Sequence, residues 1–87
     1  KLVPTLKDKV YITIDMDGFD PSVIPAVGTP EPGGLRYSQV IGLLKEVFKE
    51  KEVVGMDFVE LCPKDDDLIS PFTTAKLIYQ SIALKFK

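Results

Sequence analysis

Two uninterrupted apolar runs limit the folds open to this chain more than any other feature of its sequence. The runs are "VYITI" at residues 10–14 and "VVGMDFV" at residues 53–59, and both are rich in β-branched or aromatic side chains. Such runs are typical of strands that are buried on both faces. Between them, residues 37–50 carry the apolar stripe of an amphipathic helix, formed by Val40, Leu43, Leu44, Val47 and Phe48. Because strands joined through a helix run parallel, the pattern predicts a parallel sheet.

A second helical pattern covers about residues 71–86. Ser70 followed by Pro71 predicts its start, and Ser38 is the predicted N-cap of the first helix. The predicted elements are therefore a strand at about 10–15, a helix at about 37–50, a strand at about 53–60 and a helix at about 71–86. This alternation indicates an α/β protein.

The sheet of such a chain is incomplete. Two strands cannot close a sheet or cover their own edges, and burial on both faces requires helices on both sides. Eighty-seven residues also allow at most one small domain. We therefore expect the chain to be part of a three-layer α/β/α fold, whose other strands come from a longer protein or from other chains.

Acidic side chains follow the first strand directly. Asp15 and Asp17 are two residues apart, so a backbone that stayed extended would aim both carboxylates the same way. Paired carboxylates repel each other unless a cation offsets their charge, and oxygen ligands suit Mg²⁺, Mn²⁺ or Ca²⁺. The carboxyl ends of parallel strands are also the usual place for a site in α/β proteins. Asp20 precedes Pro21 and is predicted to open a turn and hold the loop.

The segment between the first strand and the first helix, about residues 16–36, is a long loop. Residues 18–34 contain four of the six glycines and four of the seven prolines. A loop of this length within a compact domain indicates a functional role rather than a simple connection.

Composition excludes several other classes of protein. The net charge of −2 and the scattered lysines provide no basic stripe for nucleic acid, and no apolar run is long enough to cross a bilayer. The chain has no histidine and a single cysteine, Cys62, which excludes a zinc finger and an internal disulfide. A lone cysteine favours the reducing cytoplasm. Cys62 is predicted to be a packed thiol, because no histidine is available to activate it.

Three known patterns compete for the aspartate segment. An EF-hand loop counted from Asp15 would have Phe19 and Asp20 at its fifth and sixth places, where an oxygen ligand and glycine are needed, so that interpretation fails. "YITIDMDGF" is similar to the opening motif of haloacid-dehalogenase-like phosphatases, in which Asp15 would be the nucleophile and Asp17 the general acid. Phe19 departs from that motif, which usually has Thr or Val after the glycine.

The third pattern covers much more of the chain. Residues 13–34, "TIDMDGFDPSVIPAVGTPEPGG", closely resemble the signature of the ureohydrolases, the arginase and agmatinase family. Every place of that signature is filled here, by Thr13, Ile14, Asp15, Met16, Asp17, Pro21, Pro25, Ala26 and Gly34. The resemblance continues into "VVGMDFVELCP" at residues 53–63. Within the family, "GTPEPGG" looks more like agmatinases than arginases.

The resemblance implies a hydrolase that uses two Mn²⁺ ions to cleave a guanidino C–N bond, such as agmatine to putrescine and urea. It makes Asp15 and Asp17 metal ligands, and it places Glu60 and Thr29 at the small guanidino substrate. Asp57 either orients a metal ligand or caps a helix. The resemblance also implies that the intact protein assembles into a homo-trimer or homo-hexamer.

The same resemblance shows what residues 1–87 lack. The family's other metal ligands come from an upstream His and an Asp-x-His-x-Asp segment, and this chain has no histidine. We therefore expect residues 1–87 to be the C-terminal portion of a single ureohydrolase domain, inactive without the remainder and with no certain catalytic residue of its own. A truncated, non-enzymatic remnant is the alternative.

Overall fold

The computed structural model describes residues 3–86 and has the predicted order of strand, helix, strand, helix. Short 3₁₀ turns precede β1 and follow it. The elements are Val3–Thr5 (η1), Lys9–Asp15 (β1), Met16–Gly18 (η2), Tyr37–Glu50 (α1), Glu52–Val59 (β2) and Ile69–Lys85 (α2). Between η2 and α1 runs the irregular segment that, together with η2, we call the site loop, residues 16–36.

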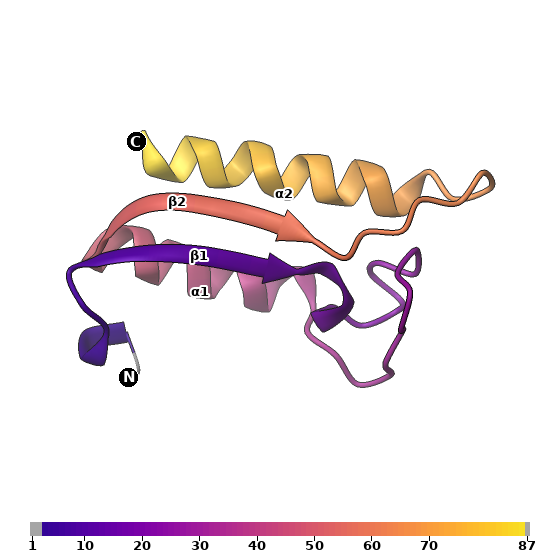
Figure 1. Cartoon of the computed structure of the whole chain (residues 1–87), viewed down its shortest axis with the longest axis horizontal. Coiled ribbons are helices and arrows are strands. Elements are labelled where there is room, and N and C mark those ends of the chain that lie inside the picture. Colours follow the sequence, from indigo (N-terminus) through magenta and orange to yellow (C-terminus); the bar gives the residue numbers. More distant parts are fainter. Residues whose placement is uncertain (1–2, 87) are drawn as a thin grey trace.

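The two strands pair in parallel, as predicted. Thr13 lies opposite Asp57 and Asp15 lies opposite Val59, with one register irregularity between Val10 and Tyr11. Both arrows in Figure 1 point toward the end of the sheet where the site loop lies. The carboxyl ends of β1 and β2 therefore meet at one edge.

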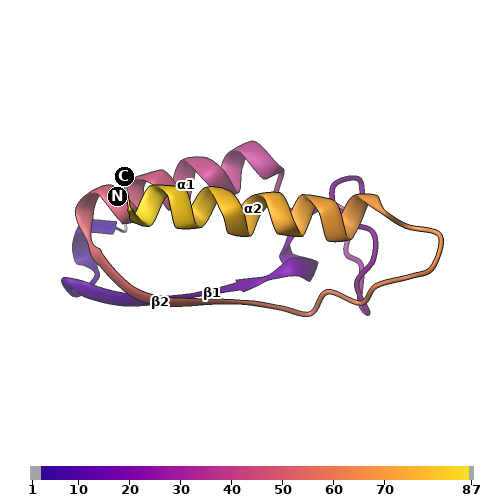
Figure 2. The same cartoon turned by 90° about the horizontal axis from the view of Figure 1, so that it is seen from above.

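Both helices lie on the same side of the sheet, as Figure 2 shows. Ile12, Ile14, Met56 and Phe58 face the helices and pack against the core. The opposite face is open, and Tyr11 on it is 59% exposed. Residues 3–86 form one sheet layer and one helix layer, so the two-sided burial that the apolar runs predict requires elements outside these residues.

The core lies between the helices and the site loop. Met16, Phe19, Ile24 and Val27 of the site loop meet Val40 and Leu44 of α1 and Leu77 of α2 in one apolar cluster. The hydroxyl of Tyr37 also donates a hydrogen bond to Gln80, which links the two helices. The site loop is thereby held by the same side chains that join the helices.

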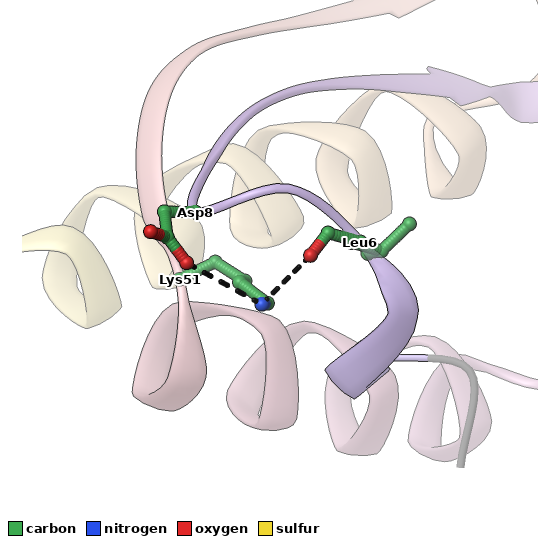
Figure 3. A network of polar contacts seen from close by, with 3 residues as sticks. All are labelled: Leu6, Asp8 and Lys51. Carbon is green, nitrogen blue, oxygen red and sulfur yellow. Dashed lines mark hydrogen bonds and ion pairs between the residues drawn. The ribbon is translucent and has the colours of Figure 1, made fainter.

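The N-terminal segment is fastened to the turn between α1 and β2 by Lys51. Its ammonium group donates to the Leu6 carbonyl at 2.9 Å and lies 4.0 Å from the Asp8 carboxylate, between the two as Figure 3 shows. The backbone N–H of Glu52 also donates to the Asp8 carbonyl at 2.8 Å. These contacts begin the strand pairing at the amino ends of β1 and β2.

The first helix has the predicted bounds but a different N-cap, and the second helix begins two residues before its predicted start. α1 begins at Tyr37, so Arg36 rather than Ser38 is the N-cap, and the Gln39 side chain accepts from the Arg36 N–H at 2.8 Å. α2 begins at Ile69, before the predicted cap and proline, because Asp67 Oδ1 accepts from the N–H groups of Ile69 and Ser70. Neither helix within residues 3–86 combines the length and hydrophobicity of a transmembrane segment.

Candidate functional site

The two predicted metal ligands lie where β1 ends and the site loop begins. Asp15 is the last residue of β1 and the N-cap of η2, with its Oδ1 accepting from the Asp17 N–H at 3.3 Å. The backbone turns here, so the extended continuation predicted from the spacing of the two residues is wrong. The turn still keeps the two carboxyl groups close, since a side-chain hydrogen bond with Asp17 is the main cause that raises the pKa of Asp15.

The electrostatic environment of Asp15 is that of crowded negative charge. The adjacent Asp17 carboxyl raises the pKa of Asp15 most strongly, with partial desolvation and the charge of Glu60 adding to the effect. The Asp17 N–H opposes the shift by favouring the ionised form. A raised pKa caused by neighbouring acids marks a place where a bound cation would relieve repulsion.

Thr29 lies beside these acids although it is twelve residues further along the chain. Its hydroxyl donates to Asp17 Oδ2 at 2.9 Å. The bond fixes one carboxylate oxygen of Asp17 and leaves Oδ1 free of this contact. The structure therefore joins Thr29 to a predicted metal ligand.

Glu60 follows Val59, the residue paired with Asp15, and so it stands at the same edge of the sheet. Its φ of 69° is the positive value of a left-handed conformation, the only one among non-glycine residues 3–86. Such a conformation costs on the order of 1–2 kcal/mol for a residue with a side chain and is found disproportionately at functional sites. The exposed Glu60 carboxylate is thus held at the edge by a strained backbone.

The donor set fits part of a divalent-cation site. Two carboxylates supply hard oxygen ligands, which suit Mn²⁺ or Mg²⁺. Within residues 3–86 no group of three or more His, Cys, Asp or Glu side chains is arranged to hold a metal ion. A cation bound between Asp15 and Asp17 would therefore need further ligands from outside residues 3–86.

Asp20 holds the site loop in shape, in agreement with its predicted role. Its carboxylate accepts from the Ser22 hydroxyl, from the Ser22 N–H at 2.9 Å and from the Gly33 N–H at 2.9 Å. These bonds lower its pKa from 3.8 to about 2. The loop closes on itself next to this point, where a side chain on Gly34 would come within 2.7 Å of the Asp20 nitrogen.

The middle of the site loop is fastened at Ala26. Its N–H donates to the buried Ser70 hydroxyl at 3.0 Å, and its carbonyl accepts from the Cys62 N–H at 2.7 Å. Ser70 thus acts at the start of α2 as a loop anchor rather than as the predicted cap. The Cys62 side chain is exposed, so the predicted packed thiol is wrong.

Asp57 bonds across the sheet instead of capping a helix. The Tyr11 hydroxyl donates to Asp57 Oδ2 at 3.0 Å. Asp57 Oδ1 is buried and has no hydrogen-bond partner among residues 3–86. The sequence pattern did not single out Tyr11. Tyr11 is two residues before Thr13, the register partner of Asp57, and so it lies on the same face of the sheet as Thr13 and Asp57.

Comparisons with known proteins agree on one family. A model of the arginase family matches residues 1–83. An N(1)-aminopropylagmatine ureohydrolase of Thermus thermophilus is 53% identical over 85 residues, which are 98% of this chain and 29% of that protein. An agmatinase of Pyrococcus horikoshii is 40% identical over 83 residues, which are 95% of this chain and 29% of that protein.

Solved structures agree with this result. The agmatine ureohydrolase of Thermoplasma volcanium matches with a TM-score of 0.82 and 38% identity over 95% of this chain and 29% of that one. An arginase of Bacillus caldovelox matches with a TM-score of 0.76 and 30% identity over 97% of this chain. The chain spans less than a third of the length of these relatives.

Proposed function

Because the chain belongs to the arginase family, we propose that residues 1–87 form the C-terminal portion of an agmatinase-like, metal-dependent ureohydrolase. The observation that carries the proposal is the meeting of Asp15, Asp17, Thr29 and Glu60 at the carboxyl edge of the sheet. Family membership also decides against the phosphatase alternative for Asp15 and Asp17. The substrate is a small guanidino compound, agmatine or a related amidine.

Each of these four residues has its own role in the proposed site. Asp15 and Asp17 hold the metal ions, and Thr29 keeps Asp17 oriented through its 2.9 Å hydrogen bond. Glu60 faces the guanidinium group, because a planar cation with several N–H donors pairs best with a carboxylate. Two Mn²⁺ ions, when bound, would supply the activation of a water molecule by lowering its pKa.

The remainder of the enzyme domain supplies the other metal ligands. Two carboxylates bind a divalent cation weakly and cannot hold two ions. We also propose that the intact protein is a cytoplasmic homo-oligomer, a trimer or a hexamer. The free thiol of Cys62 is compatible with a reducing compartment.

The test uses the complete subunit that carries these residues. We expect Asp15→Asn and Asp17→Asn to lower Mn²⁺ affinity and urea release from agmatine by roughly a hundredfold or more, since each removes an ionised ligand. Glu60→Gln is expected to raise KM for agmatine while Mn²⁺ affinity stays unchanged. The matched control is Asp66→Asn, an exposed acid in the turn before α2. Unaltered metal binding in both ligand variants would refute the proposal.

A further inference from the structure

A row of side chains on the open face of the sheet leads along β1 to the carboxylates. Residues two apart on a strand share a face, so Tyr11, Thr13 and Asp15 all lie on the side away from the helices. Their register partners on β2 are Gly55, Asp57 and Val59. Asp57 therefore lies beside Thr13, one step along the face from the proposed metal ligand Asp15.

Tyr11 reaches Asp57 because residue 55 is a glycine. A Cβ atom at Gly55 would lie 2.7 Å from Cε1 and 2.8 Å from Cδ1 of the Tyr11 ring, which is too close for any side chain. The ring occupies this space, and its hydroxyl donates to Asp57 Oδ2 at 3.0 Å. This hydrogen bond, with some desolvation and the charge of Asp57, raises the pKa of Tyr11, so the phenol remains a donor.

The second oxygen of Asp57 is the informative atom. Oδ1 is buried, yet no donor among residues 3–86 reaches it. An unpaired buried carboxylate oxygen is costly, so such an atom points to a donor supplied by another part of the protein. Beside a metal site the usual donor is the ring N–H of a metal-binding histidine, which a carboxylate orients from behind. This chain contains no histidine.

We propose that Tyr11 is a positioning residue of the metal site, acting through Asp57. Its hydroxyl occupies Oδ2 and so fixes the carboxylate with Oδ1 turned to an N–H of a metal-binding imidazole from the remainder of the domain. Gly55 is required because it makes room for the ring. The inference rests on the proposed function, since it needs a metal beside Asp15.

The experiment measures Mn²⁺ binding to the metal-free complete subunit by titration calorimetry, together with thermal unfolding of the same metal-free protein. Asp57→Asn is expected to weaken Mn²⁺ binding by about 10- to 100-fold, and Tyr11→Phe by about tenfold. Tyr11→Phe keeps the ring on Gly55 and removes only the donor. The matched control is Tyr37→Phe, which removes a phenol hydroxyl that donates to Gln80 on the helix side of the sheet.

The outcomes separate this inference from the function on which it rests. Unchanged Mn²⁺ affinity in Tyr11→Phe, while Asp57→Asn weakens binding, would overturn the role of Tyr11. Loss of thermal stability in both variants with no change in affinity would reduce the pair to a structural contact and would also overturn it. A wild-type subunit that binds no Mn²⁺ would instead refute the proposed function.

Discussion

The site loop and the outer surface of α2 differ in how much apolar surface they bury. Met16 and Ile24 of the site loop are completely buried although the segment has little regular structure. On α2, which is regular over seventeen residues, large apolar side chains are exposed. They are Ile69, Phe72, Tyr79 and Ile82, and the exposed C-cap residue Phe86 follows them.

This difference shows which part of the chain buries its own apolar side chains and which part does not. The core side chains of the site loop fix its backbone, so Asp17 and Thr29 can meet without a helix or strand to carry them. The outer surface of α2, in contrast, leaves its apolar side chains exposed within residues 3–86. An apolar groove of about 320 Å³ also lies between β2 and α2.

The largest expected effect concerns the metal ligands that residues 1–87 lack. The isolated 87-residue chain, supplied with agmatine and Mn²⁺, is expected to release essentially no urea, because the ligands from the remainder of the domain are missing. The measurement is a urea-release assay alongside the complete subunit at equal molar concentration. Turnover near that of the complete subunit would mean that residues 1–87 contain every residue needed for catalysis. This result would contradict the proposal that the remainder of the domain supplies metal ligands.

A pair of isoleucines tests the comparison directly. Ile24→Ala in the site loop is expected to cost about 2–5 kcal/mol of unfolding free energy, because it opens a cavity at a fully buried position. Ile69→Ala at the start of α2 is expected to cost less than about 1 kcal/mol, since that side chain is 65% exposed. Chemical denaturation of both variants of the complete subunit gives the two values.

An equal cost for the two isoleucine variants would show that the remainder of the enzyme buries Ile69. In that case the start of α2 would have to be counted as an internal surface of the enzyme rather than as its exterior. A small cost for Ile24→Ala would instead mean that the site loop is less firmly anchored than its burial indicates.

A pair of buried serines tests how the site loop is fastened. Ser70→Ala is expected to cost about 1–3 kcal/mol, because it leaves the Ala26 N–H without its acceptor and removes the 2.7 Å hydrogen bond from the Ser70 hydroxyl to Asp67. Ser81→Ala is expected to cost less, since the Ser81 hydroxyl bonds only to the Leu77 carbonyl within α2. The difference in unfolding free energy measures the combined contribution of the Ser70 contacts to Ala26 and Asp67. We also expect weaker Mn²⁺ binding in Ser70→Ala alone, and equal affinities in the two variants would separate the anchor from the site.

Much of the fold could be predicted from short-range pattern. Apolar runs and helical periodicity identified both strands, both helices and the parallel pairing, because these depend on residues close in sequence. The bounds of the first helix were predicted correctly, but both predicted caps, Ser38 and Ser70, were wrong, because Gln39 and Asp67 accept the hydrogen bonds at the two helix starts. The two-sided burial of the strands depends on elements outside residues 3–86.

The candidate site was predictable only as a set of residue types. Asp15 and Asp17 stand out through their spacing, and Glu60 and Thr29 through a family resemblance. The bond from Thr29 to Asp17 and the strained φ of Glu60 depend on the path of a loop that no periodicity describes. Tyr11 was missed because its partner Asp57 is 46 residues away and the enabling feature is an absent side chain at Gly55.

The smallest expected effect is a pH dependence that belongs to the site loop alone. The pKa of Asp20 is about 2 in the fold, below its ordinary value of 3.8, because Ser22 and Gly33 donate to the ionised carboxylate. The fold therefore favours the ionised form. This contribution to stability is complete above about pH 5 and declines as the pH falls through 3.8 toward 2.

The variant Asp20→Asn isolates that contribution. Thermal unfolding of wild type and variant, compared between about pH 5 and pH 3, should give a difference in midpoint that is largest at the higher pH and shrinks on acidification. No titratable group on α2 shares the three donors of Asp20, so the decline reports on the loop rather than on the outer surface. A difference that stays constant over this range would place the pKa of Asp20 at its ordinary value, and the loop would then owe its shape to its buried apolar side chains alone.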